Sequence, residues 1–370
     1  MFLPYIQKTK TLALLALIQI FLLCFVKLSS SPTYKKHLDA QDYLDAMIIS
    51  ICNSNTNEID LEECNLLGDI NTPYTSKGGD EYSKRITLKK IFPNVFIDYF
   101  NSIGLQPGDT IAVAMTGSFP GASLAMYAAS KTLGIHPVVI SSVGSSAYGA
   151  NTEDLSIIDI EDILFKQEYI NNRSIAASLG GKNDKGNYLL PSTDKKDSSR
   201  YNYMINKIKN LDIELINQSS LLQSIEDRIR IYSSSISGKY KAYINIGGGA
   251  ASLGLDSDTL RYMPSGIIIN NGSKNYTIDG VASKFLNNKI PIINIQDITT
   301  IQSTFDIDPG SYIYDTAEYS LNDFIKKSKL NPYIVICAWI LSVFSIIFIG
   351  YQSFKQIKER MKDIEPESLL

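Results

Sequence analysis

Glycine, serine and threonine gather in four short segments of this chain, each directly after an apolar run. The segments are 116–121, 141–151, 178–186 and 245–254. Backbone N–H groups in turns of this composition, together with neighbouring hydroxyls, bind phosphate or carboxylate groups, above all where a helix begins. The pattern therefore predicts an anion-binding site, provided that the fold brings the four segments together.

The predicted ligand-binding residues are the hydroxyl, amide and glycine positions of these segments: Thr116, Gly117, Ser118, Gly121, Ser141, Ser142, Gly144, Ser145, Ser146, Asn151, Gly180, Gly181, Gly247, Gly248 and Gly249. Ser118 and Ser145 are also the candidate catalytic nucleophiles, with the glycine turns as an oxyanion hole. Hydroxyls in such turns equally serve as helix caps or ligand contacts. Lys77, followed by Gly78 and Gly79, fits either an anion contact or an ordinary loop.

Familiar nucleotide-binding and hydrolase motifs do not fit these segments. The first turn lacks the spacing and the lysine of a P-loop, the run from Gly247 does not continue as GxGxxG, and no serine lies in GxSxG. A Ser-His-Asp triad needs a histidine, and the chain has only His37 and His136. His136 begins an expected strand, opposite the turns, so we expect a structural role for it. A Ser–Lys arrangement with Lys182 or Lys185 stays open.

Metal, cofactor and nucleic-acid sites have little support. Asp159 and Asp162 fall on one face of an expected helix, but acidic residues at a helix start are ordinarily solvated. We predict no metal and no cofactor. The formal net charge of −3 offers no basic surface for nucleic acid.

Strands and helices alternate through the middle of the chain. We expect strands at 110–115, 136–140, 174–178, 213–216, 241–246, 266–270 and 290–295, and helices at 122–133, 155–168, 195–210, 221–232, 281–287 and 297–305. This alternation is typical of an α/β fold with a mainly parallel, doubly wound (Rossmann-like) sheet. Parallel strands end at one edge, so the four turns should converge where such sheets bind ligands.

The region before the first strand is expected to be helical. Leu44, Met47, Ile48 and Ile51 recur at helical spacing within an expected helix at 33–52, and a second helix, interrupted or started near Pro93, is expected within 88–103. Cys52 and Cys64 enclose a short polar loop and are the only cysteines outside the apolar segments. They are candidates for a disulfide, with two unrelated thiols as the alternative.

Two apolar segments flank the chain. Residues 12–26 suit an uncleaved signal anchor, with a cleaved signal peptide as the alternative, and 333–351 is long enough to span a bilayer, with a buried core helix as the alternative. Two spans place both termini on one side of the membrane. Six basic residues flank the spans on each side, so charge does not fix the orientation. The candidate disulfide favours an extracytoplasmic domain.

The expected organisation therefore has five parts. They are a cytoplasmic tail and signal anchor (1–32), a helical region with the disulfide loop (33–104), the α/β domain (105–329), a transmembrane helix (330–352) and a charged tail (353–370).

The glycine-rich segments also carry a family resemblance. The motifs TGSFPG (116–121), VISSVGSSAYGAN (139–151), SIAASLGG (174–181) and NIGGGAASLG (245–254) make the chain resemble the poly-gamma-glutamate system protein family. The resemblance covers about 85–300 and keeps the motif order. Tyr148 stands where the family commonly has tryptophan, and the glycine run after Leu179 is shorter than the family's.

The resemblance implies a protein of the bacterial cytoplasmic membrane. Its partners would be poly-γ-glutamate and the membrane subunits of the synthase and export machinery, and its role would lie in making, exporting or anchoring a capsule. It supplies no catalytic mechanism. Three hypotheses follow: an accessory protein that binds or guides the polymer or scaffolds the synthase, a serine hydrolase or transpeptidase of γ-glutamyl amides, and a small-ligand or nucleotide sensor.

Overall fold

The computed structural model describes residues 9–28, 32–55, 66–190, 198–254, 263–270, 272, 279–307 and 332–362. They belong to two compact units, one of residues 36–317 and one of residues 1–35 and 318–370. The first unit carries the α/β fold and the second carries the two apolar helices.

A seven-stranded sheet forms the centre of the first unit. Its strands are β2 (Thr110–Thr116), β3 (His136–Ser142), β5 (Ala176–Ser178), β6 (Glu214–Ile216), β7 (Tyr243–Ile246), β8 (Gly266–Ile268) and β9 (Ile292–Ile295). The spatial order is β6-β5-β3-β2-β7-β9-β8. Every neighbouring pair is parallel except β8 and β9, which are antiparallel. The mainly parallel α/β fold is confirmed, and each predicted strand is present.

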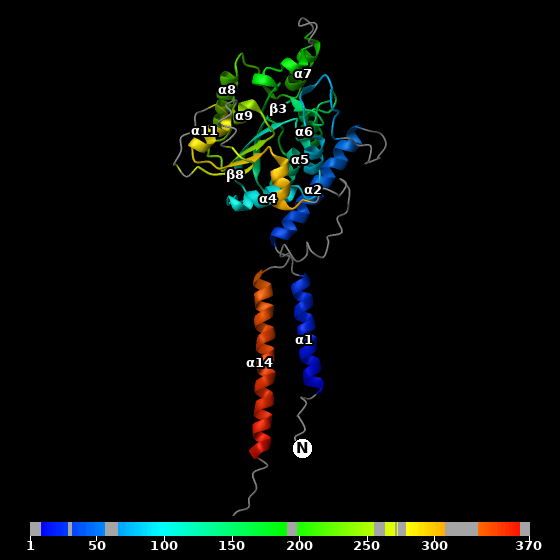
Figure 1. The fold of residues 1–370 in the computed structure, drawn as a ribbon, viewed down its shortest axis with the longest axis vertical. Helices are drawn as coiled ribbons and strands as arrows, with labels where there is room; N and C mark the ends of the chain where they lie inside the picture. The colour runs from blue at the N-terminus through cyan, green and yellow to red at the C-terminus, as the bar shows by residue number, and fades with distance from the viewer. Residues whose placement is uncertain are drawn as a thin grey trace, which may run out of the picture. The chain divides into compact units, whose positions relative to one another are not determined.

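Helices cover both faces of this sheet (Figure 1). One face packs on α8 (Leu221–Ser235), α9 (Ala250–Leu253) and α11 (Val281–Asn287). The other packs on α2 (Pro32–Asn55), α4 (Pro93–Ser102), α5 (Pro120–Leu133), α6 (Ile157–Lys166), α7 (Ser199–Asn210) and α12 (Ile298–Phe305). Leu44, Met47, Ile48 and Ile51 of α2 are all buried in this second core, as their spacing predicts.

The strand order reverses between β2 and β7. The chain leaves β2 for β3, β5 and β6 on one side, and then returns to place β7 and β9 on the other side. The carboxyl ends of β2 and β7 therefore diverge into loops that turn away in opposite directions. Such a junction, called the switch point below, is where open α/β sheets form a ligand-binding crevice.

Among the elements that were not predicted from the sequence, three lie beside the second glycine-rich turn or before α4. Helix α3 (Glu81–Thr87) precedes α4, and the short strands β1 (Thr75–Lys77) and β4 (Ser145–Ser146) pair in parallel in a sheet of their own. Strands this short show no readable alternation of polar and apolar residues. The second expected helix begins at Pro93, where its interruption or start was expected, and proline is well suited to a first helical turn.

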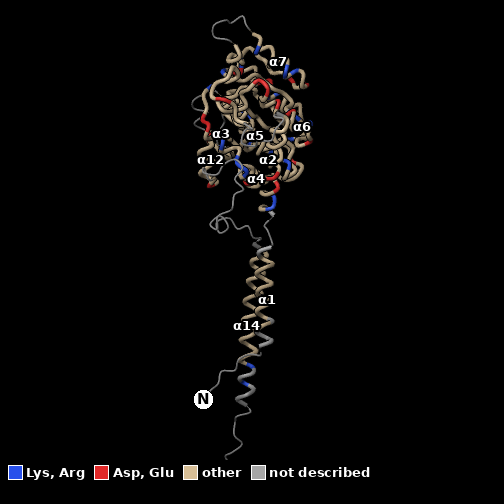
Figure 2. Tube along the Cα trace, turned by 90° about the vertical axis from the view of Figure 1, so that its right-hand side faces the viewer, with Lys and Arg blue, Asp and Glu red and all other residues tan. Residues whose placement is uncertain are grey.

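The second unit contains α1 (Thr9–Leu28) and α14 (Pro332–Lys362), which pack side by side (Figures 1 and 2). The segment Tyr333–Lys355 is long and apolar enough to cross a membrane, with a mean hydropathy of 2.5, and none of its most apolar stretch is buried. The apolar part of α1, Leu15–Val26, is shorter. Ser342 Oγ donates a hydrogen bond to Gln19 Oε1 across the pair (2.6 Å).

Candidate functional site

The four glycine-rich turns do meet at one edge of the sheet. The strands that they follow, β2, β3, β5 and β7, are adjacent and parallel, so all four turns lie at the carboxyl edge. The last residues of three strands, Thr116, Ser142 and Ser178, stand in register across this edge. Convergence of the turns, which the alternation of strands and helices predicted, follows directly from the sheet topology.

A segment from the region before β2 lies across this edge and covers the second turn. Strand β1 pairs with β4, and Ala147 N donates to Lys77 O (2.9 Å). Asn151 Nδ2 donates to Asp69 O and to Thr75 Oγ1, at 2.7 Å each. Asn151 is itself buried. The segment thus brings Lys77 to the carboxyl edge, and it engages the amide of Asn151, which was predicted to contact ligand.

The switch point is lined by backbone and by polar side-chain ends. Gly247 has φ +96°, and a Cβ there would lie 2.3 Å from Thr116 Oγ1, so only glycine fits between β7 and β2. A Cβ on Gly248 would instead meet Lys77 Nζ at 3.2 Å and Gln296 Nε2 at 3.5 Å. Two side-chain nitrogens that carry donors therefore face the bare backbone of Gly248, an arrangement suited to a carboxylate or phosphate oxygen.

A buried lysine lies beside the same turns. Lys84 of α3 is 2% exposed. Its ammonium donates to the Ser118 carbonyl and to Ser146 Oγ (2.6 Å), and it lies 4.0 Å from the centre of the Phe119 ring. Burial, and next the charge of Lys77, lowers the pKa of Lys84 from 10.5 to about 7. Within the described residues no carboxylate pairs with this lysine. We call Lys84, Ser118, Phe119 and Ser146 the Lys84 cluster.

Several predicted glycine positions are packing contacts between turns. A Cβ on Gly144 would lie 3.0 Å from Gly181 N, and one on Gly180 would lie 3.0 Å from Gly144 N. A Cβ on Gly121 would lie 2.7 Å from the backbone of Thr87. These glycines allow backbones to touch. Their role as ligand contacts stays a prediction, and the geometry gives them a second reason to be glycine.

The predicted hydroxyls differ in their surroundings. Ser145 Oγ, fully buried, donates to the carbonyl oxygens of Gly117 and Ser146, both at 2.9 Å. Ser118 Oγ accepts from Ser146 N (3.1 Å). Ser145 therefore stabilises the turn, and among the described residues its hydroxyl contacts only backbone carbonyls, whereas Ser118 and Ser146 both belong to the Lys84 cluster. The catalytic candidacy of Ser118 and Ser145 is not tested by these contacts.

The third turn holds a buried ion pair. Arg228 of α8 donates to Asp184 Oδ2 (2.8 Å) and to Ser178 Oγ (2.7 Å), and both charged side chains are less than 5% exposed. Ser178 Oγ also donates to Asp184 Oδ1 (2.6 Å), and Ser142 Oγ lies 3.1 Å from Ser178 Oγ. The hydrogen bonds of this network are satisfied within it, which indicates a structural role for its two serine hydroxyls, of which Ser142 was predicted to bind ligand.

Two acidic residues of α6, Asp159 and Asp162, are paired with basic side chains. Asp159 accepts from Lys207 (2.7 Å) and from the Ser156 hydroxyl in a capping box, and Asp162 pairs with Lys166 and Arg173. In the part of the chain that the structure describes, no three potential ligands gather into a metal site. The acidic helix start thus has a structural explanation.

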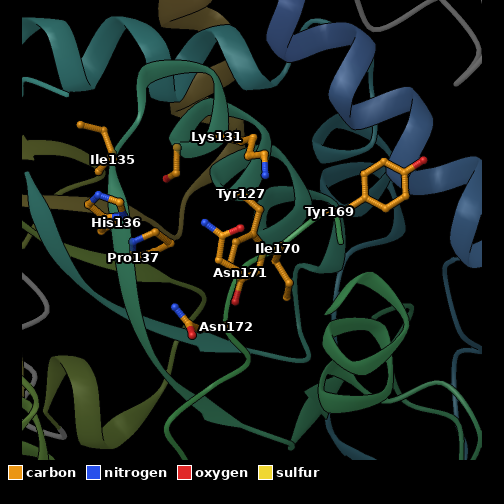
Figure 3. Close-up of a pocket in the computed structure, with 10 residues that line it drawn as sticks. Tyr127, Lys131, Ile135, His136, Pro137, Tyr169, Ile170, Asn171 and Asn172 are labelled. Carbon is orange, nitrogen blue, oxygen red and sulfur yellow. The ribbon is translucent and has the colours of Figure 1, made fainter. Parts of the chain in front are cut away.

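Both histidines lie away from the carboxyl edge. His37 Nε2 is 2.8 Å from Asp98 Oδ1 and links α2 to α4. His136 lines a pocket at the opposite edge, beside Lys131 and Asn171 (Figure 3). The expected position of His136 is confirmed by its place at the start of β3.

Lys84 and Arg228 are the two buried cations of this edge that the motif search missed, and Asp184, the partner of Arg228, was missed with them. One signal for Lys84 was available: Lys84, Leu88 and Ile91 recur at helical spacing, so a lysine stood in phase with apolar positions. The same signal marked Arg228, because Leu221, Ile225, Arg228 and Tyr232 recur at helical spacing and Ile225 and Tyr232 are buried with it.

Cys52 is buried and takes part in a disulfide. Its predicted partner Cys64 lies outside the described residues, so the specific pairing stays a prediction. Comparisons of the chain with protein-family models, with curated proteins and with solved structures find no match.

Proposed function

We propose that this protein is a membrane-anchored module that binds carboxylate groups of an anionic polymer at the switch point. The observation that carries the proposal is the bare backbone of Gly248, which is faced by the ammonium of Lys77 and by the amide nitrogen of Gln296. A polymer with one carboxylate per residue supplies the complementary charge.

The family resemblance of the four turns identifies the polymer of this proposal as poly-γ-glutamate. The protein would then serve the synthase and export subunits as an accessory partner that holds or guides the nascent chain. A two-pass topology suits this role, and the Gln19–Ser342 hydrogen bond supports it, because polar side chains pair across helices inside a bilayer. The disulfide at Cys52 supports an extracytoplasmic domain.

The test is direct binding by the full chain in lipid nanodiscs. Oligomers of γ-linked glutamate are titrated calorimetrically at low and at high salt, and we expect saturable binding that weakens as salt rises. Lys77→Gln should weaken binding roughly fivefold, the loss of about one exposed charge contact. The matched control is Lys131→Gln, which removes the same charge at the opposite edge and should bind like the unaltered protein. Absence of binding at low salt would refute the proposal.

A further inference from the structure

The Lys84 cluster contains the two partners of a nucleophile–base pair. Lys84 Nζ lies 2.6 Å from Ser146 Oγ, within the range that such a pair needs. The remaining acceptor of Lys84 is a backbone carbonyl, that of Ser118. No carboxylate within the described chain holds the lysine in its charged form, so a neutral amine is accessible near neutral pH, as the lowered pKa of Lys84 indicates.

The serine hydroxyl is free to give up its proton. Ser146 Oγ accepts from Lys84 and donates to no other acceptor among the residues described. When Lys84 is neutral, the same 2.6 Å contact can run in the opposite direction, from the hydroxyl to the amine. Ser146 N is held by Ser118 Oγ (3.1 Å), which fixes the orientation of the serine.

Ser146 and Lys84 are both buried, and the exposed residue Gly79 covers Ser146. A Cβ on Gly79 would be 3.0 Å from Ser146 Oγ, so the backbone of this exposed glycine lies directly against the hydroxyl. Within the described residues, the N–H groups of Gly78 and Gly79 donate to no acceptor. They are therefore available to an oxyanion that develops beside Ser146.

We propose that Ser146 is a nucleophile activated by Lys84, and that the protein cleaves or transfers acyl groups of amide bonds. The substrate class, γ-glutamyl amides, rests on the proposed function. The Ser146 hydroxyl passes its proton to neutral Lys84 while Oγ bonds to the carbonyl carbon. The C–N bond then breaks, and the Lys84 ammonium returns the proton to the leaving nitrogen. Water, or the amine of a second chain, attacks the acyl-serine with Lys84 again as base, and Ser146 regains its proton.

The test uses the full chain in detergent and a fluorophosphonate probe, which transfers its phosphonyl group to an activated serine with loss of fluoride. Mass spectrometry should find the adduct on Ser146, at a rate that rises with pH and is half-maximal near pH 7. Lys84→Met and Lys84→Arg should each slow labelling at least about 100-fold, the usual worth of a general base. Ser123→Ala removes a buried hydroxyl of α5 and should label normally.

Thermal unfolding of each variant shows whether slower labelling is caused by loss of the base or by loss of the fold. The pH profile of labelling is measured on the unaltered protein and therefore tests the proposal without any variant. No adduct on Ser146, or equal labelling in Lys84→Met, would overturn the proposal. Polymer binding is measured separately, by calorimetry with γ-glutamate oligomers on Ser146→Ala, which cannot cleave them. If this variant binds the polymer but the unaltered protein is not labelled at Ser146, only the nucleophile is refuted. If the unaltered protein shows Lys84-dependent labelling but the polymer does not bind, the nucleophile is supported and only the polymer is refuted.

Discussion

Two buried cations lie at the same edge of the sheet and are held in opposite ways. Arg228 meets the carboxylate of Asp184 and the hydroxyls of Ser142, Ser178 and Ser224, so its charge is compensated. Lys84 meets one carbonyl, one hydroxyl and an aromatic ring, without a carboxylate partner in the described chain. Removing one partner of a buried ion pair is costly, so such a pair holds the surrounding side chains in place. A buried ammonium without a carboxylate partner has a lowered pKa and loses its proton near neutral pH. The difference distinguishes a structural cation from a functional candidate.

The largest effect should come from breaking the compensated pair. Arg228→Met leaves Asp184 charged and buried without its partner, so the free energy of unfolding should fall by about 3–5 kcal/mol. Chemical denaturation of the full chain in detergent measures this. The control is Arg230→Met on the same helix, where an exposed arginine pairs at the surface and little change is expected. A loss in Arg228→Met no larger than in the control would remove the distinction.

Replacing Lys84, the buried cation without a carboxylate partner in the described chain, should not lower the free energy of unfolding. Lys84→Met substitutes an apolar side chain of similar length for a charge that burial disfavours. We expect the free energy of unfolding at neutral pH to stay unchanged or to rise by roughly 1–2 kcal/mol. The same denaturation experiment reports it. A marked destabilisation would mean that Lys84 is as structural as Arg228.

The pH dependence of stability sharpens the same contrast. Between about pH 7 and 10.5 the unfolded chain keeps the Lys84 proton while the folded protein has lost it. The unfolded state then binds more protons, so the free energy of unfolding rises with pH in this window. Asp80, the nearest carboxylate to influence Lys84, has a lowered pKa and does not titrate there. The slope should be smaller in Lys84→Met, and equal slopes would contradict the assignment.

A third buried charge extends the comparison to an acid. Glu161 is fully buried beside Tyr127 and Ser174, and burial raises its pKa from 4.5 to about 7. The folded state binds the extra proton between these values, so the free energy of unfolding should fall as pH rises from about 4.5 to 7. Glu161→Gln keeps the shape and removes the titration. The midpoint temperature of thermal unfolding should fall less across this pH range in the variant than in the unaltered protein.

Features that depend on local sequence were predictable, whereas contacts between residues far apart in the sequence were not. The parallel sheet was predictable because its strands are continuous apolar runs such as β2, which are legible without knowledge of their neighbours. The meeting of the four turns followed from topology. The contacts within that edge did not follow, because they join residues such as Lys84 and Ser146 whose proximity depends on α3, β1 and β4. Those elements are too short to leave a periodic signal.

The glycines of the turns have a second reason to be glycine besides the predicted contact with ligand. A Cβ on Gly144 or on Gly180 would meet the backbone of the facing turn, so these two glycines allow the turns to touch. Sequence alone does not separate these roles, since both need a bare backbone. Only the surroundings of Gly248, where side-chain nitrogens replace backbone neighbours, distinguish a site from a packing contact.

The strand order also has a consequence for biosynthesis. Thr116 Oγ1 lies 3.5 Å from the carbonyl of Ile246 across 130 residues of chain, so β2 acquires its second neighbour only after β7 has been made. Until then one side of β2, a highly apolar strand, stays open to other chains. A chain in which β7 has not yet been made has neither a switch point nor a second neighbour for β2. Protection from aggregation by chaperones should therefore matter most during synthesis of the interval between these two strands.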